Sequence, residues 1–183
     1  DLGVAILDGC KPGETKKVAA NKSVADGFTL DRQPEELAQY EKVVSETFFS
    51  AHEMATITIL ADIIIPKDEV SGSASEAKVP EFIEFIVKDM PTHQTPMRGG
   101  LRWLDLYSSK KNGKSFKDSS KEQQIAIVDE IAYPKKATKL VGQGVAFFTL
   151  MRDLTVTGFY TTKMGGDDLG LDRVIHFRPV SES

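Results

Sequence analysis

The clearest pattern of apolar and polar positions in the chain lies between Ser50 and Pro66. Its apolar residues recur at three- and four-residue steps, as they do on one face of an α-helix: Met54, Ile57, Leu60, Ala61 and Ile64. Ser50 and Glu53 have the spacing of a capping box, in which each side chain hydrogen-bonds to the backbone of the other residue. The pattern therefore predicts a helix that begins after Ser50 and ends before Pro66.

A second apolar helix is predicted after a loop of small residues over 67–78. Val79-Pro80 places proline in a first helical turn, where its missing N–H is harmless. The apolar side of this helix consists of Phe82, Ile83, Phe85, Ile86 and Met90. We interpret the two helices, from Ser50 to Met90, as the stretch around which the chain is organised.

Four further segments have helical signals. Pro34 and two glutamates open an amphipathic segment of about three to four turns. Its apolar positions are Leu37, Tyr40, Val43, Val44 and Phe48. A second segment covers 98–107 and is followed by a turn over 110–114. Ser119 and Glu122 are interpreted as a capping box for a third segment, which ends at Pro134. The fourth segment covers 137–160.

These signals predict an all-α fold, a single compact helical domain of about five to six helices with an extended N-terminal arm. A β-branched tract near Thr155 has the composition of a short strand, but it has no evident strand to pair with. We expect the arm over residues 1–33, the helical domain over 34–170 and a C-terminal tail over 171–183.

Composition limits the classes of function. The 183 residues are 40% hydrophobic and 27% charged, as in a globular domain with a sizeable core. No apolar run approaches the ~18 residues that a membrane span needs. The net charge of -4 removes the electrostatic attraction to phosphate, so no nucleic-acid partner is expected.

The lone cysteine, Cys10, lies after an apolar run from Leu2 to Leu7 and before a segment rich in Pro, Gly and Lys. Leu7 and Gly9 fit the small-residue box that precedes the lipidated cysteine of bacterial lipoproteins, whereas Asp8 does not. Two interpretations stay open. Either this is a signal-like remnant with a lipid anchor on Cys10, or it is an N-terminal arm with an incidental cysteine.

Candidate catalytic and ligand-binding motifs are few. Histidines occur only at 52, 93 and 176 and have no H-x-x-x-H pair, so solvent-facing or capping roles are preferred over zinc binding. Gly142-Gln143-Gly144 lies inside a predicted helix, which favours a close helix contact over a phosphate site. Gly165-Gly166-Asp167-Asp168 with Asp172 lacks the residue order of a calcium loop, and a glycine helix stop before an acidic loop is preferred.

Four acidic residues of the first helix pair raise the question of a paired-carboxylate site for acid–base chemistry: Glu53, Asp62, Glu81 and Glu84. Glu53 already has a capping role. Asp62 is expected to form an ion pair between helices with Arg98, Arg102 or Arg152. The residues therefore predict no catalytic, cofactor-binding or metal-binding site.

Longer stretches of the sequence resemble one family. Residues 48–66 read F-F-S-x-x-E-x-x-T-x-x-x-L-A-D-x-I-I-P, and residues 73–83 read S-A-S-E-A-x-V-P-E-F-I. Phe116, the Ser119 capping box and Gln123-Gln124 follow, and residues 147–162 read F-F-x-x-x-R-x-x-T-x-x-G-F-Y-T-T. Together, over roughly 48–170, they resemble the gluconate 2-dehydrogenase subunit 3 family. The segment TKMGGDDLG (162–170) is similar to the branch that accompanies glycoside 3-dehydrogenases.

The resemblance implies a non-catalytic small subunit of a periplasmic FAD-dependent sugar dehydrogenase complex, of the glycoside 3-dehydrogenase or gluconate 2-dehydrogenase type. The expected partners are a large flavoprotein of the glucose-methanol-choline type, which holds FAD and oxidises a sugar hydroxyl, and a c-type cytochrome, whose haem accepts the electrons. The small subunit would act as an escort in twin-arginine export, assembly and stability of the flavoprotein. No activity is expected from this chain alone. The expected location is the periplasm, at the membrane if Cys10 carries lipid.

An escort must bury a large surface on its partner, and aromatic and arginine side chains dominate the energy of such interfaces. We expect contacts from the loop over 67–78, the segment over 158–170 and the N-terminal arm. The expected interface residues are Phe49, Ser73, Ser75, Trp103, Arg152, Phe159, Tyr160 and Met164. Phe48, Phe82 and Phe147 are assigned to the core. The alternative function is that of a free-standing, lipid-anchored interaction module of the periplasm.

Overall fold

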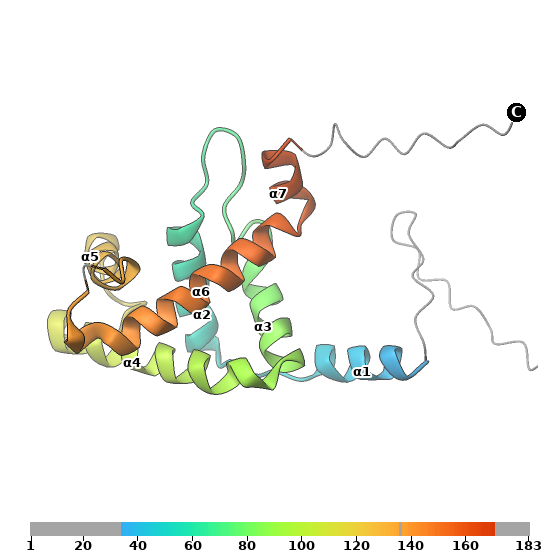
Figure 1. Ribbon diagram of the computed structural model, residues 1–183, viewed down its shortest axis with the longest axis horizontal. Coiled ribbons are helices and arrows are strands. Elements are labelled where there is room, and N and C mark those ends of the chain that lie inside the picture. The colour runs from blue at the N-terminus through green and yellow to red at the C-terminus, as the bar shows by residue number, and fades with distance from the viewer. Residues whose placement is uncertain (1–33, 136, 171–183) are drawn as a thin grey trace, which may run out of the picture. The chain divides into compact units, whose positions relative to one another are not determined.

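The computed structural model describes residues 34–135 and 137–170, and within them every regular element is helical (Figure 1). This confirms the all-α prediction, and the β-branched tract near Thr155 is part of a helix rather than a strand. The α-helices are α1 (Pro34–Ser45), α2 (Ala51–Ile64), α3 (Val79–Asp89), α4 (Gln94–Asn112), α5 (Lys121–Ala132), α6 (Gly142–Tyr160) and α7 (Lys163–Asp168). Two 3-10 turns, η1 (Pro91–His93) and η2 (Lys139–Val141), precede α4 and α6.

The boundaries of α2 follow the local signals. The Ser50 side chain accepts a hydrogen bond from the Glu53 backbone N–H, and the Glu53 carboxylate accepts one from the Ser50 N–H. The helix ends at Ile64, two residues before Pro66. The predicted capping box and proline stop of this helix are confirmed.

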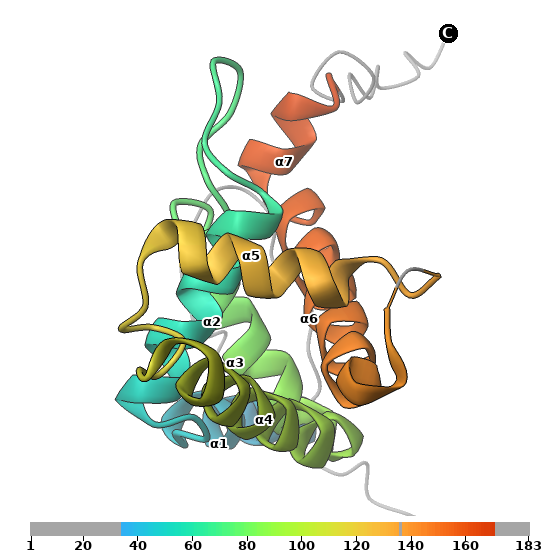
Figure 2. The same ribbon diagram turned by 90° about the vertical axis from the view of Figure 1, so that its left-hand side faces the viewer.

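The central element of the described residues is α6, which packs against α2, α3, α4, α5 and α7 (Figures 1 and 2). Apolar residues surround most of its circumference, as expected for a helix covered on several sides. The interpretation that the chain is organised around the stretch from Ser50 to Met90 is therefore wrong. The helices α2 and α3 form only part of the layer that covers α6.

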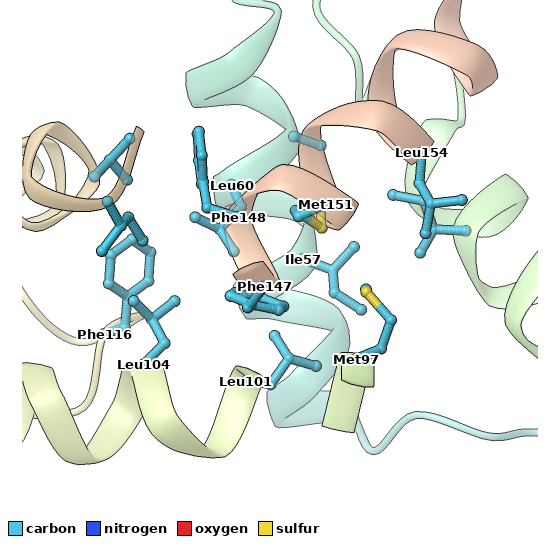
Figure 3. Close-up of a cluster of buried hydrophobic side chains, with 14 of the residues drawn as sticks. Ile57, Leu60, Met97, Leu101, Leu104, Phe116, Phe147, Phe148, Met151 and Leu154 are labelled. Carbon is cyan, nitrogen blue, oxygen red and sulfur yellow. The ribbon is translucent and has the colours of Figure 1, made fainter. Parts of the chain in front are cut away.

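The hydrophobic core forms where side chains of α2 and α4 meet those of α6 (Figure 3). Ile57, Leu60 and Met151 are fully buried in it. Deletion of a side chain of this size from a core costs roughly 2–5 kcal/mol, so this contact contributes strongly to the stability of the fold. Phe147 lies in the core, and Phe48 and Phe82 pack against it partly buried.

The N-terminus of α5 differs from the prediction by one residue. Ser120, not Ser119, caps this helix, and its reciprocal partner is Gln123 rather than Glu122. The Ser119 hydroxyl is buried and lies 3.0 Å from the Ser108 hydroxyl of α4. The two adjacent serines thus have different roles, one in capping and the other in packing.

The first helix, α1, contributes less to the core than its apolar stripe predicts. Val43 is buried, but Leu37, Tyr40 and Val44 are each more than 40% exposed. The Tyr40 ring packs at 5.8 Å from the Phe85 ring of α3. The helix ends at Ser45, so Phe48 lies outside it.

Two glycine-containing segments also differ from the sequence expectations. Gly142 is the first residue of α6 rather than an interior one, although the preceding element is a 3-10 turn and not a strand. A Cβ at Gly144 would lie 2.2 Å from the Trp103 ring, which confirms the expected close helix contact. The predicted glycine helix stop at 165–166 is wrong, because both glycines lie within α7; Asp172 is outside the described residues.

Candidate functional site

The loop over 67–78 is held at its base by buried or partly buried hydrogen bonds. The Asp62 carboxylate of α2 accepts hydrogen bonds from the Ser75 backbone N–H and from the Ser75 hydroxyl, both at 2.8 Å. Ser73 and Glu76 form a reciprocal side-chain and backbone pair, and the Ala74 N–H donates to the Ile65 carbonyl. The loop therefore has a defined conformation, with its ends fixed on α2 and α3.

The tip of this loop is an Asx-type turn that exposes an apolar side chain. One Asp68 carboxylate oxygen accepts hydrogen bonds from the backbone N–H groups of Val70 and Ser71, both at 2.8 Å. These bonds lower the pKa of Asp68, the Ser71 bond more than the Val70 bond, because they favour its charged form. Val70 is 77% exposed. A turn that fixes the backbone thus presents an isolated apolar residue to solvent.

This loop lies beside α7, at the end of the fold where α6 finishes (Figures 1 and 2). A Cβ at Gly72 would lie 2.9 Å from the sulfur of Met164, so the loop and α7 are in direct contact. Tyr160 and Leu169 are exposed at the same end of the chain's helical part. We call the loop over 67–78 together with residues 158–170 the loop–α7 surface.

The residues expected at an interface divide between the core and the surface. Phe49 and Phe159 are core residues, 2% and 1% exposed, and Ser73 is 8% exposed. These three side chains offer almost no area of their own to a partner. Ser75 is partly buried on Asp62, and Met164 is partly buried against the loop.

The remaining expected residues reach the surface in different places. Tyr160 is 38% exposed, and its ring packs edge-on against Phe159. Arg152 lies on α6, with its guanidinium 3.5 Å from the Asp153 carboxylate. Trp103 is half-buried on α4 and stacks on Tyr107 with the ring centroids 4.9 Å apart. Cys10 lies outside the described residues.

Asp62 and Glu84, two of the four acidic residues considered for acid–base chemistry, have structural partners. The expected ion pair of Asp62 with Arg98, Arg102 or Arg152 is wrong, because its carboxylate accepts from Ser75. Glu84 accepts hydrogen bonds from the backbone N–H groups of Phe48 and Phe49 at 2.6 and 3.1 Å. Both carboxylates therefore hold neighbouring backbone segments in place, and their oxygens are occupied by these donors.

A hollow of about 440 Å³ between α2 and α4 is lined by several polar and charged side chains. The His52 ring nitrogen Nε2 lies 2.6 Å from one Asp105 oxygen, and the other Asp105 oxygen accepts from the Phe116 backbone N–H. Arg98 lies 3.5 Å from Glu53 at the other end of the hollow. Ser50 and Ser109 also line this hollow, but in the described part of the chain no serine hydroxyl hydrogen-bonds to a histidine.

A charged network joins α4 to α5. The Glu130 carboxylate accepts hydrogen bonds from the Tyr107 hydroxyl at 2.5 Å and from the Lys111 ammonium. Burial raises the pKa of Glu130, but the bonds from Lys111 and Tyr107 outweigh it and leave the pKa below its usual value. The hydrogen bond to Glu130 raises the pKa of Lys111. The pKa of Tyr107 is raised mainly by burial and, to a smaller extent, by the hydrogen bond to Glu130.

Two kinds of site are absent from the part of the chain that the structure describes. No group of three or more His, Cys, Asp and Glu side chains is arranged to hold a metal ion. None of the described helices combines the length and the apolar character that a bilayer crossing requires.

The sequence reasoning missed two surface features that the structure makes evident. The first is the Asx turn at the loop tip, for which an Asp placed before Ser71-Gly72 is a usable signal. The second is the exposed face of α4, where Arg98, Gly99 and Arg102 line a hollow of about 370 Å³. No local pattern marks that face, because it depends on which side of α4 packs against α6.

Comparison with known proteins gives the family. The model of the family described as gluconate 2-dehydrogenase subunit 3 matches residues 51–180. This range includes α2 to α7 and therefore nearly all of the helical elements described above. No curated protein and no solved structure gives a significant match. The chain thus belongs to the gluconate 2-dehydrogenase subunit 3 family.

Proposed function

We propose that this chain is the non-catalytic small subunit of a periplasmic FAD-dependent sugar dehydrogenase complex. In this role it binds a flavoprotein large subunit, of the glycoside 3-dehydrogenase or gluconate 2-dehydrogenase type, and assists its export, assembly and stability. The large subunit holds FAD and oxidises the sugar, and a c-type cytochrome accepts the electrons. Membership in the gluconate 2-dehydrogenase subunit 3 family supports this class of complex.

The observation that carries the proposal is the loop–α7 surface. Its loop is fixed by hydrogen bonds to Asp62 at the base and by the Asx turn of Asp68 at the tip, yet its tip residue Val70 is 77% exposed. Ordering of flexible loops is one of the main free-energy costs of association. A loop that is ordered before binding avoids this cost, which favours a docking role over a merely connecting one.

The polar chemistry of the described residues supports a binding role in the same way. Glu53, Asp62 and Glu84 are occupied by backbone or hydroxyl donors. Catalytic acids and bases need a proton acceptor or donor left open to substrate. The arrangement therefore favours a subunit whose contribution is a surface, with the flavin chemistry in its partner.

The test is co-expression of the tagged chain with a candidate flavoprotein large subunit from the same genome. The chain purified alone should be colourless, and the co-purified complex should be yellow and should oxidise sugar with a dye as electron acceptor. A colourless, inactive complex, or a stable monomer that captures no flavoprotein, would refute the proposal.

A matched pair of variants tests the loop–α7 surface itself. Val70→Asp places a charge on the loop tip and should weaken the complex by about tenfold or more, because a charge must then be desolvated in the interface. Leu140→Asp is the control, since Leu140 is 81% exposed in η2, before the opposite end of α6. If both variants lost affinity equally, or if neither lost affinity, the result would argue against docking through this surface.

A further inference from the structure

Gly99 lies in the interior of α4 without an intramolecular reason to be glycine. A Cβ at Gly99 would meet no atom within 4 Å, whereas a Cβ at the next residue, Gly100, would lie 2.0 Å from the Phe147 ring. The backbone at Gly99 is helical and its φ is not positive. Glycine at an exposed position inside a helix costs about 1 kcal/mol relative to alanine. Packing within the chain explains Gly100 but leaves Gly99 unexplained.

The two charged residues beside Gly99 in the 370 Å³ hollow are both arginines. Arg98, Gly99 and Arg102 share this hollow with Phe48, Gln94 and Thr95, and no acidic side chain lines it. The chain as a whole carries a net charge of -4, and Arg98 already lies 3.5 Å from the Glu53 carboxylate, so in the described part of the chain Arg102 carries the unpaired positive charge of this hollow.

The two guanidinium groups differ in how they are held. Arg98 donates a hydrogen bond at 2.6 Å to the Phe48 carbonyl and lies 4.0 Å above the Phe48 ring, so its position is fixed before any partner arrives. Arg102 is exposed, and within the described residues it makes no hydrogen bond or ion pair. One arginine is thus preorganised and the other has its donors open.

We propose that Arg98, Gly99 and Arg102 form a second docking surface, which binds an acidic segment of the flavoprotein large subunit. The backbone of that segment approaches α4 at Gly99, where a side chain would hold it away, and one of its carboxylates pairs with the open Arg102 guanidinium in the two-pronged geometry that arginine favours. This inference rests on the proposed function and adds the chemistry of the partner at a contact remote in sequence from the loop–α7 surface.

A protein carboxylate fits this surface better than a phosphate polymer or a membrane. Recruitment to anionic lipid relies on clusters of roughly four to eight basic residues, and only two line this hollow. The net charge of -4 disfavours approach to any extended polyanion. Close backbone approach at glycine is also a feature of packing against another polypeptide.

The test measures the affinity of the chain for its co-expressed flavoprotein in three variants. Arg102→Glu should weaken the complex by about tenfold or more through charge repulsion, and Gly99→Trp should weaken it to a similar extent through steric blocking. Lys121→Glu makes the same charge change at an exposed position of α5 and should leave the affinity unchanged. Thermal unfolding of each isolated variant checks that the fold is retained, which is expected because both test positions are exposed.

Zero-length crosslinking identifies the occupant directly. The variant Arg102→Lys places an amine on this face, and carbodiimide should join that amine to an Asp or Glu of the flavoprotein. Wild-type affinity of both Arg102→Glu and Gly99→Trp, together with no crosslink, would overturn this inference and leave the proposed function intact. The inference would also be overturned if the wild-type chain bound to anionic lipid vesicles and Arg102→Glu abolished this binding while leaving the complex with the flavoprotein unaffected. A wild-type chain that captures no flavoprotein would overturn both proposals.

Discussion

The adjacent glycines of α4 provide a sharp test of how this fold is packed. Alanine at Gly99 meets open space, so its effect on stability is that of helix propensity alone, a gain of about 1 kcal/mol. Alanine at Gly100 brings the same gain but places its Cβ 2.0, 2.2 and 2.6 Å from three Phe147 atoms. The third of these is the Phe147 Cβ, which moves only when the α6 backbone moves.

The cost at Gly100 follows from this geometry. Overpacking of a core typically costs 1–3 kcal/mol, and Phe147 is only 3% exposed, so its ring has little room to turn away. Subtraction of the propensity gain leaves Gly100→Ala about 0–2 kcal/mol less stable than the wild type, and therefore about 1–3 kcal/mol less stable than Gly99→Ala. In a chain of this size that lowers Tm by up to about 8 °C, whereas Gly99→Ala raises it by about 2–4 °C.

The assay is denaturant and thermal unfolding of the two variants, followed by far-UV circular dichroism, which reports directly on helix content. The two substitutions are chemically identical and one residue apart, so each is the control for the other. Gly100→Ala as stable as Gly99→Ala would refute the close α4–α6 contact. Destabilisation by Gly99→Ala would refute the statement that this position faces open space.

Three further predictions follow from the side-chain contacts. Ser120→Ala should destabilise the chain by about 1 kcal/mol through loss of the α5 cap, measured by denaturant unfolding. Asp62→Ala should cost about 1–3 kcal/mol and speed amide hydrogen exchange in the 67–78 loop, because it leaves two donors without their acceptor; unchanged exchange would contradict the anchoring role. Glu130→Gln should cost about 1 kcal/mol at neutral pH. Because the pKa of Glu130 is lowered, its contribution to stability is present above its usual pKa and is lost as the pH falls through the lowered pKa. Because the pKa values of Lys111 and Tyr107 are raised, their contributions to stability are lost as the pH rises through the raised values. A stability difference between Glu130→Gln and the wild type that does not vary with pH would refute this coupling.

Signals that act within one turn of helix were readable from the sequence. The Ser50–Glu53 box, the Pro66 stop and the Val79-Pro80 start depend on contacts between residues a few positions apart, so the chain needs no tertiary structure to specify them. The all-α class follows from the same local information.

Where two local solutions had similar chemistry, the sequence did not distinguish them. Ser119 with Glu122 and Ser120 with Gln123 are both acceptable capping boxes. The structure uses the second, and the Ser119 hydroxyl is buried against Ser108 of α4. That choice depends on how α4 packs beside α5, which no spacing within the chain reveals.

Local patterns in the sequence specified the helical class, both ends of α2, the start of α3 and the family to which the chain belongs, because these rest on local hydrogen bonding and on residue order. The tertiary structure decided which residues are available to a partner. It placed the expected interface residues Phe49 and Phe159 in the core, left Val70 and Arg102 exposed, and gave Asp62 a partner in the loop instead of an arginine. Exposure of a side chain depends on the packing of helices that are far apart in sequence, and a one-dimensional pattern does not contain that information.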